Sequence, residues 1–367
     1  MGLFGKGKNN FIGVDIGMGG TKIVELCNEK GRARLVTYGF SENHPGNDPF
    51  PPMTDEKESA KLLKEICRQA RTTTTKAVAS LPISSVFSSV VTVQKSPEDK
   101  DFRETVTAQA RKLIPLPLED MVLDFKVIPQ VAAVRPVAAK KEEETGQKPK
   151  ISNQVLITGA SRSLVQRYVG IFRAAGLEMV SLETETFPLI RSLIGKDRSI
   201  TMIVDIGSVR TNIVIVENGI PYVARSLDMG GNSFTRAMSQ SLSIELQEAE
   251  RMKCDIKGVS SLYPGEELPK IFADTVMPML TELQYSMGLY AEQGEGQSVK
   301  TVERVIVTGG ASALPSLISH LEGKLSTKVY VGDPWARIVY PEGLRPVLDE
   351  IGYRYAVSVG LAMRDID

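Results

Sequence analysis

The chain has 367 residues, 42% of them hydrophobic and 24% charged, which is the composition of a globular protein of about two to three domains. Its 44 basic residues balance 44 acidic ones, and this zero net charge excludes a protein that coats nucleic acid through an overall basic field. Three widely spaced cysteines and two histidines exclude a disulfide framework and a cysteine–histidine zinc cluster.

The first 75 residues predict a short tail, a pair of strands and an amphipathic helix. Residues 1–10 lack the apolar stretch of a signal peptide, and we expect a flexible tail there. A buried strand ends at Asp15, and a second apolar strand follows the glycine turn directly, whereas a dinucleotide-binding unit would continue with a helix. Asp55 is the expected N-cap of a helix over 55–72.

Residues 76–180 read as a separate small α/β subdomain. We expect strands within 77–93, a helix over 101–113, a strand over 121–128, a solvated loop over 132–150, a strand over 154–158 and a helix over 161–175. No stretch of the chain approaches the roughly 20 apolar residues of a membrane-spanning helix, and we therefore expect a cytoplasmic location.

The opening pattern returns about 190 residues later. Asp205, like Asp15, ends an apolar strand and is followed by Ile-Gly, a short turn and a second apolar strand. This period is too long for a solenoid, and it indicates two related lobes that face one another. After the second copy we expect a helix over 234–257, a helix over 268–291 kinked at Pro278, strands over 304–308 and 328–331, and a final helix over 353–363.

Three glycine turns, each after a buried strand, carry the candidate site. The turns 15–22 (DIGMGGTK) and 205–211 (DIGSVRT) hold small residues that let backbone N–H groups approach an anion. Asp15 and Asp205 would hold Mg²⁺, through water, because Mg²⁺ keeps several waters and needs few carboxylates. The turn 307–312 (VTGGAS) suits the close approach of a nucleoside. Any one of these turns alone is more typical of a plain tight turn than of a phosphate-binding loop.

In this order and spacing, the three turns resemble the two phosphate loops and the adenosine loop of the actin-like, ribonuclease H-fold ATPase superfamily. The Ala-Glu-x-x-Lys helix turn of that superfamily is similar to residues 249–253, which implies that Glu250 and Lys253 contact ribose and base. The alternative is a solvent-exposed ion pair. Glu185 matches the acidic residue that orients the attacking water in catalytic members. The nucleotide-binding residues that the resemblance implies are Asp15, Gly17, Gly19, Gly20, Thr21, Lys22, Asp205, Gly207, Ser208, Thr211, Glu250, Lys253, Gly309, Gly310, Ala311 and Ser312.

Within the superfamily, the whole chain resembles the FtsA-related PilM family of the type IV pilus assembly platform. The segments that carry this resemblance are 22–26 (KIVEL), 113–125 (LIPLPLEDMVLDF), 185–191 (ETFPLIR) and 355–364 (YAVSVGLAMR). The departures from the family pattern are Gly19-Gly20 where serine or alanine is commoner, Thr186 instead of proline after Glu185, and a longer 132–150 loop. None of them removes a binding element.

The resemblance implies an α/β, actin-like ATPase (ribonuclease H-like) two-lobed fold with a small α/β subdomain inserted in the first lobe. The implied divisions are the flexible tail (1–10), the first-lobe core (11–75 and 181–198), the inserted SHS2-like subdomain (76–180), the second-lobe core (199–230 and 300–352), a helical subdomain (231–299) and a C-terminal helix that packs back on the lobes (353–367).

The function implied by the resemblance is that of a cytoplasmic scaffold that binds ATP and Mg²⁺. It would grip the N-terminal cytoplasmic tail of a PilN-like inner-membrane protein in a groove lined by residues 77–93 and 102–125, as an extended peptide, so that membrane association is indirect. No nucleic-acid partner is expected. Self-association and ATP hydrolysis are left open.

Two other classes compete with this interpretation. A small-molecule (sugar) kinase is suggested by Gly19-Gly20-Thr21-Lys22, but two extra residues separate this run from Asp15-Ile16, and the cysteine-rich zinc motif of that group is absent. An FtsA-like filament-forming protein would carry a C-terminal amphipathic membrane helix, and we expect none after Met363, which ends the last core helix.

Overall fold

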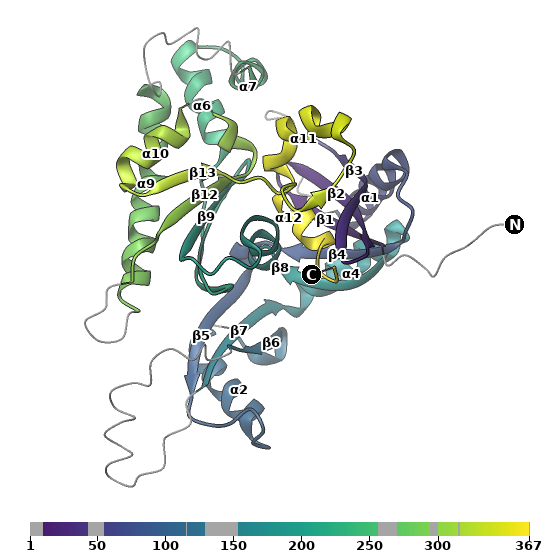
Figure 1. The fold of residues 1–367 in the computed structure, drawn as a ribbon, viewed down its shortest axis with the longest axis vertical. Helices are drawn as coiled ribbons and strands as arrows, with labels where there is room; N and C mark the ends of the chain where they lie inside the picture. Colours follow the sequence, from purple (N-terminus) through teal and green to yellow (C-terminus); the bar gives the residue numbers. More distant parts are fainter. Residues whose placement is uncertain are drawn as a thin grey trace, which may run out of the picture. The chain divides into compact units, whose positions relative to one another are not determined.

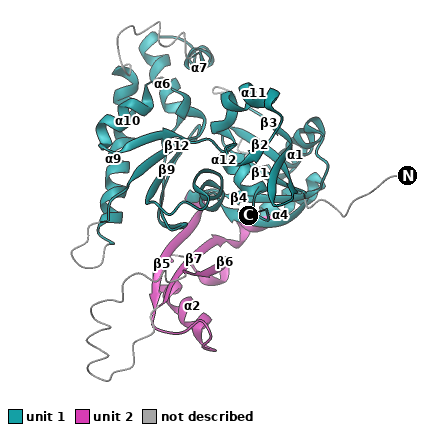
Figure 2. Cartoon of the chain, in the orientation of Figure 1, with its two compact units in different colours: residues 1–83, 167–367 teal, residues 84–166 magenta. Residues whose placement is uncertain are grey.

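The computed structural model describes residues 10–42, 55–114, 116–128, 153–255, 270–293, 300–314 and 316–366. Residues 1–9 of the predicted tail and the predicted loop at 132–150 lie outside the described residues. The chain divides into two compact units, a large unit of residues 1–83 and 167–367 and a small unit of residues 84–166 (Figure 2).

A six-stranded sheet forms the first half of the large unit, in the order β14-β3-β2-β1-β4-β8 (Figure 1). Strands β1, β2 and β3 form an antiparallel meander, β4 and β8 run parallel to β1, and β14 pairs in parallel with β3 at the other edge. Its strands are β1 (Asn10–Gly17), β2 (Gly20–Glu29), β3 (Arg32–Phe40), β4 (Lys76–Leu81), β8 (Glu178–Thr184) and β14 (Ile338–Val339).

A five-stranded sheet forms the second half of the large unit and repeats this topology. Its order is β11-β10-β9-β12-β13, again an antiparallel meander followed by two parallel strands. Its strands are β9 (Thr201–Ile206), β10 (Thr211–Glu217), β11 (Ile220–Leu227), β12 (Arg304–Thr308) and β13 (Lys328–Val331). The internal repeat seen in the sequence is therefore a repeat of structure, which confirms the predicted pair of related lobes.

Helix α1 (Glu56–Ala70) shows how local sequence sets an element boundary. The Asp55 carboxylate accepts hydrogen bonds from the backbone N–H groups of Lys57 (2.9 Å) and Glu58 (3.1 Å), as predicted for an N-cap. Leu63 and Ile66 lie on the buried face, one turn apart. The helix ends at Arg71, which adopts the left-handed conformation.

The predicted helix over 234–257 is wrong, because the structure has two helices there, α6 (Gly231–Leu242) and α7 (Leu246–Cys254). Ser243 between them has a φ of 54°, which no residue inside an α-helix adopts. The remaining helices of the large unit are α4 (Arg162–Ala175), which crosses the unit boundary, α5 (Thr186–Leu189), α9 (Lys270–Ala291), α10 (Leu317–Leu325), α11 (Arg345–Ile351) and α12 (Ala356–Ala362).

Helix α12 packs directly on the first sheet. A Cβ atom at Gly13 of β1 would lie 1.9 Å from the Ser358 carbonyl oxygen, and one at Gly360 would lie 2.0 Å from the Pro188 carbonyl oxygen. Only glycine permits these approaches. A buried cluster that includes Phe11, Ile203 and Leu361 joins strands of both sheets to α12.

The described residues of the small unit include a three-stranded antiparallel sheet on which a helix packs. The strands β5 (Val86–Val93), β7 (Asn153–Ser161) and β6 (Met121–Val127) lie in that order, and α2 (Phe102–Leu113) packs its Phe102, Val106 and Ala110 on them. This unit is narrower than the predicted subdomain of residues 76–180, because β4 and β8 hydrogen-bond within the six-stranded sheet.

Among the described helices, none is both long and apolar enough to span a membrane.

Candidate functional site

The first glycine turn joins β1 to β2 and brings a carboxylate and a cation together. Asp15 and Lys22 are opposite each other in the hairpin, and Lys22 Nζ lies 3.7 Å from Asp15 Oδ2. Gly20 has a φ of 130°, and a Cβ there would lie 1.9 Å from the Ser41 carbonyl oxygen. A side chain at this position would therefore open the turn. The Lys22 side chain keeps 19% of its surface exposed, which leaves its amine accessible to an anion.

The second glycine turn joins β9 to β10 and meets the first. Its backbone closes through a hydrogen bond from Gly207 N–H to the Arg210 carbonyl (2.9 Å), and the Gly231 N–H at the start of α6 donates to the Gly207 carbonyl (2.8 Å). A Cβ at Gly19 would lie 2.9 Å from Ser208 Oγ, which places the two turns in contact. The Ser208 hydroxyl is buried and has no hydrogen-bond partner among the described residues.

The third glycine turn follows β12, next to the second. Gly309 has a φ of 86°, and a Cβ there would lie 2.5 Å from Asp205 Oδ1. Ala311 is buried in the core, and the Ser312 hydroxyl donates to the Gly309 carbonyl (2.7 Å). At Gly310, by contrast, an added Cβ would meet nothing within 4 Å. Gly310 is therefore the residue of this turn that faces open space.

Glu185 lies at the start of α5, beside the second turn. Its Oε2 accepts hydrogen bonds from the Ile83 backbone N–H (3.1 Å) and from Asn212 Nδ2 (3.0 Å). Ser226 Oγ donates to Asn212 Oδ1 (3.0 Å) and so fixes the orientation of the amide. Asn212 thus connects a carboxylate of the first lobe to a strand of the second.

Asn212 is a site residue that the sequence reasoning missed. It is opposite Asp205 in the β9–β10 hairpin, as Lys22 is opposite Asp15 in the β1–β2 hairpin. Since the two turns are copies of one another, the position could have been found from Lys22. Tyr168 was also missed: its side chain is fully buried, and its hydroxyl has no partner among the described residues.

The carboxylates of this region are held in surroundings that disfavour their charge. Burial raises the pKa of Glu185 to about 8, and the neighbouring Asp15 and Asp205 carboxylates add to the rise. Burial also raises the pKa of Asp205 to about 6, with a further contribution from Asp15. The pKa of Asp15 is raised by burial against the opposing effect of Lys22. A cation is therefore favoured here.

Glu250 and Lys253 are not the solvent-exposed ion pair considered as the alternative, because Lys253 is buried. Lys253 Nζ donates to Glu250 Oε2 (2.6 Å), Thr235 Oγ1 (2.8 Å) and the Gly231 carbonyl (3.2 Å). Burial alone would raise the pKa of Glu250, but the Lys253 charge and the hydrogen bonds from Lys253, Thr235 and Cys254 together lower it. The pair thus fastens α7 to the start of α6, where the second turn also packs.

The structure places the other predicted residues as follows. Thr21 is buried, and its N–H donates to Ser41 Oγ (3.0 Å). Thr211 is buried, and its hydroxyl donates to the Met229 carbonyl (2.7 Å). A Cβ at Gly17 would lie 3.2 Å from Lys22 Nζ. Thr21 and Thr211 therefore use at least part of their hydrogen-bonding capacity within the fold.

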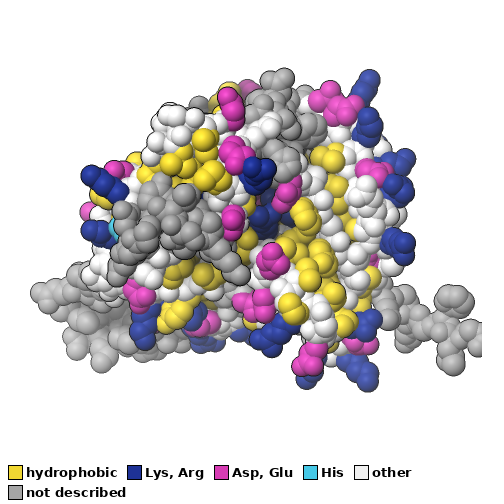
Figure 3. All heavy atoms as spheres, turned by 90° about the horizontal axis from the view of Figure 1, so that it is seen from above, with side chains coloured by type: hydrophobic (Ala, Val, Ile, Leu, Met, Phe, Trp, Pro, Cys, Tyr) yellow, Lys and Arg dark blue, Asp and Glu magenta, His cyan; other side chains and the backbone are white. Residues whose placement is uncertain are grey.

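These residues fit a nucleotide with its divalent cation. Gly310 faces open space, the buried Ser208 hydroxyl has no partner among the described residues, and Lys22 supplies a cation. Seen from above, the molecule has a hollow near the centre of this face, with basic and acidic side chains along it (Figure 3). Within the described part of the chain, no group of three or more His, Cys, Asp or Glu side chains is arranged to bind a metal directly.

Comparison with known proteins identifies a matching family and several similar folds. The family described as "Type IV pilus assembly protein PilM" matches residues 13–366. The solved "PilM-PilN type IV pilus biogenesis complex" contains a chain 24% identical to this one, with a TM-score of 0.79, covering 97% of this chain and 98% of that one.

More distant solved structures have the same actin-like fold, as predicted. The ethanolamine utilization protein EutJ from Carboxydothermus hydrogenoformans is 15% identical, with a TM-score of 0.51, over 97% of this chain and 90% of that one. MreB 5 of Spiroplasma citri bound to AMPPNP is 12% identical, with a TM-score of 0.51, over 98% and 97%.

Cell division protein FtsA of Bacillus subtilis (strain 168) is 23% identical over an alignment of 246 residues, which covers 62% of this chain. The matching region covers 54% of FtsA, about half its length.

Proposed function

The chain belongs to the family of type IV pilus assembly protein PilM, and from this membership we propose that it is a nucleotide-binding scaffold of a type IV pilus assembly platform. The observation that carries the nucleotide part is the contact between the two glycine turns, where Gly19 leaves room for the unpaired Ser208 hydroxyl. Two facing turns of backbone N–H groups suit the phosphates of one nucleotide, bound between the lobes.

We assign roles to the residues of this site as follows. Lys22 and the glycine turns within residues 15–22 and 205–211 would bind the phosphates of ATP. Asp15 and Asp205 would hold Mg²⁺ through water, and the ion would offset the charge that burial disfavours on them. Gly309 and Gly310 would lie against the nucleoside, and Glu250 with Lys253 would border the ribose and base.

The raised pKa of Glu185 favours nucleotide binding without rapid hydrolysis as the role of this site. With a pKa of about 8, its carboxyl group holds a proton at neutral pH in the ligand-free chain and accepts no proton from a water molecule. A bound cation would lower this pKa. We therefore propose slow turnover at most, with Glu185 as the residue that orients water, and nucleotide binding as the event that sets lobe closure.

The proposed nucleotide site is tested by isothermal titration of ATP with Mg²⁺ into the full chain. Lys22→Ala and Asp205→Ala should each weaken binding about tenfold or more, because each removes a charged contact to the phosphates or their cation. Lys324→Ala, an exposed lysine on α10, is the matched control and should bind as the unchanged chain does. Unchanged affinity in both site variants would refute the assignment.

We further propose that the chain binds the N-terminal cytoplasmic tail of a PilN-like inner-membrane protein. The support is family membership and the similarity of the chain to a protein of the solved PilM-PilN complex. The residues predicted to line the peptide groove at 102–125 differ in exposure. Ile114 is buried in the core of the small unit, whereas Leu113 and Leu116 are 45% and 53% exposed. The exposed pair is available to a partner.

The partner proposal is tested with a synthetic peptide from the cytoplasmic tail of such a membrane protein. Leu116→Asp should weaken its binding about tenfold, because a charge replaces an apolar contact. Val347→Asp on α11, where the valine is 44% exposed, is the control and should leave binding unchanged. If the unchanged chain does not bind the peptide at high micromolar concentration, the scaffold proposal fails.

A further inference from the structure

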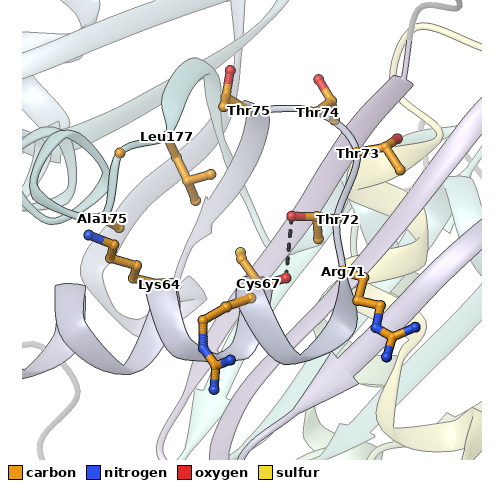
Figure 4. Close-up of a pocket in the computed structure, with 11 residues that line it drawn as sticks. Lys64, Cys67, Arg71, Thr72, Thr73, Thr74, Thr75, Ala175 and Leu177 are labelled. Carbon is orange, nitrogen blue, oxygen red and sulfur yellow. Dashed lines mark hydrogen bonds between the residues drawn. The ribbon is translucent and has the colours of Figure 1, made fainter.

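A basic recess lies in the large unit at the end of α1. Its volume is about 610 Å³, within the range of ligand pockets. The last turns of α1, the threonine run 72–75 and the turn at 175–177 form its walls. Its lining contains the three cations Lys64, Arg68 and Arg71 and no carboxylate. Figure 4 shows Lys64 reaching toward the turn at Ala175, with Arg71 on the other side of Cys67.

The carboxylates of α1 leave two basic residues of this helix, and Arg71 directly after it, unpaired. Glu56 lies 3.9 Å from Arg167, Glu58 lies 3.7 Å from Lys61, and Glu65 forms a bidentate pair with Arg68. Asp55 is used by the helix N-terminus. The side chains of Lys57, Lys64 and Arg71 form no ion pair or hydrogen bond with any described residue, and all three are exposed.

The unpaired cations recur at a regular interval along α1. Lys57 and Lys64 are seven residues apart, which is about two turns, or roughly 10.5 Å of helix axis at 1.5 Å per residue. Arg71 follows seven residues later, directly after the last residue of the helix and in the left-handed conformation. All three cations are exposed, whereas Ala60, Leu63 and Ile66 are buried and pack α1 on the protein. The recess lies at the Arg71 end of this row.

The recess is built on a fixed support. The Glu25 carboxylate is fully buried and accepts hydrogen bonds from Thr73 N (2.7 Å), from the Thr73 hydroxyl and from Asn10 Nδ2 (3.0 Å). The Thr72 N–H and hydroxyl both donate to the Cys67 carbonyl. The threonine run is therefore held in place before any ligand arrives, which lowers the entropy cost of binding.

From this arrangement we propose that the α1 face is a docking site for an acidic segment of a partner protein, bound in an extended conformation. In the polyproline II form of an extended segment, three residues make one turn and span about 9 Å, so carboxylates at every third position lie on one side and would meet Lys57, Lys64 and Arg71 in turn. The three cations are spread over about 21 Å, which is too far for one phosphate group to contact them all. The recess can take a side chain of a bound segment, whereas a flat membrane surface has no side chain to place in it. None of these residues belongs to the proposed nucleotide site.

The test is fluorescence anisotropy with the full chain and two labelled ten-residue peptides. One peptide carries glutamates at positions 2, 5 and 8, and the other has the same composition with three adjacent glutamates. The variant Lys64→Glu/Arg71→Glu is compared with Lys324→Glu/Lys328→Glu, which makes the same charge change at exposed lysines of α10 and β13. Thermal unfolding confirms that both variants fold.

We expect the spaced peptide to bind more tightly than the adjacent one by about threefold, and binding to weaken as salt rises. The Lys64/Arg71 variant should lose about tenfold or more in affinity, and the control about twofold or less. The proposal is overturned if the unchanged chain does not bind the spaced peptide at about 1 mM or if the control variant loses as much. Binding of phosphatidylglycerol vesicles through Lys64 and Arg71, with neither peptide bound, would also overturn it.

Discussion

Glu185→Gln should make the chain more stable at neutral pH and flatten the pH dependence of its stability. The pKa of Glu185 is raised from 4.5 to about 8, chiefly by burial and then by Asp15 and Asp205. Between these two values the unfolded chain ionises this group while the folded chain keeps the proton. Stability from this group is therefore fully present below about pH 4.5 and is lost as the pH rises to about 8. Glutamine cannot ionise, and its side chain keeps an oxygen that can accept the hydrogen bonds from Ile83 and Asn212.

The size of the effect follows from the shift. A change of 3.5 pKa units at about 1.36 kcal/mol per unit corresponds to at most about 5 kcal/mol over the whole window. Glu185 retains some contact with solvent, which reduces this value, and we expect a loss of about 2–3 kcal/mol between pH 5 and pH 7.5. Asp205, with a pKa of about 6, titrates in both proteins, so the difference between them isolates Glu185.

The assay is urea unfolding at pH 5, 6.5 and 7.5, without nucleotide and with a metal chelator present. The Glu185→Gln variant should gain on the unchanged chain as the pH rises, at a constant denaturant slope. Glu342→Gln, on an exposed turn, is the control and should follow the unchanged chain. If the free energies of unfolding of Glu185→Gln and the unchanged chain stay parallel from pH 5 to 7.5, Glu185 does not hold its proton in the folded state and the reasoning fails.

Three further outcomes can be measured on the same protein. Gly20→Ala should lower the free energy of unfolding by about 2 kcal/mol or more, because Gly20 has a φ of 130° and lies close to the Ser41 carbonyl. Gly31→Ala, where an added Cβ meets open space, should lower the free energy of unfolding by less in the same urea titration. Lys253→Met should lower the free energy of unfolding by about 2–3 kcal/mol, because it leaves the Glu250 charge without its ion-pair partner. The double variant Lys253→Met/Glu250→Gln should recover part of that loss, and full additivity of the two single changes would contradict the coupling between these residues. Cys254 is exposed, whereas Cys27 and Cys67 are buried, so thiol labelling reports on Cys254. ATP with Mg²⁺ should slow this labelling several-fold if the nucleoside lies against the Glu250–Lys253 pair of α7. An unchanged labelling rate would place the nucleoside elsewhere.

The parts of the fold that depend on neighbouring residues were predictable from the sequence. Asp55 caps the helix that follows it, and the two Asp-Ile-Gly turns each join a pair of antiparallel strands. Hairpins of this kind need only short-range pairing, and their apolar strands are evident in the sequence.

The parts that depend on distant contacts were not predictable. Ser243 ends α6 in the left-handed conformation, and no glycine or proline marks that break. The partnership of Glu185 with Asn212 joins the first lobe to a strand of the second. Lys253 is buried only because Thr235 and the Gly231 carbonyl, on another helix, accept its hydrogen bonds. Such contacts are set by tertiary packing, which has no local pattern.

The packing of α12 on β1 also sets the order in which the protein is completed during synthesis. At about 5–20 residues per second, the ribosome needs roughly 15–70 s to make the stretch between β1 and α12. Until residues 356–362 emerge, Gly13 and its neighbours lack the helix that covers them, and β3 lacks its edge partner β14. The first sheet, although its first strands are translated early, therefore stays unfinished until residues 338–339 and 356–362 have been made, and its apolar strands need protection from aggregation throughout that time.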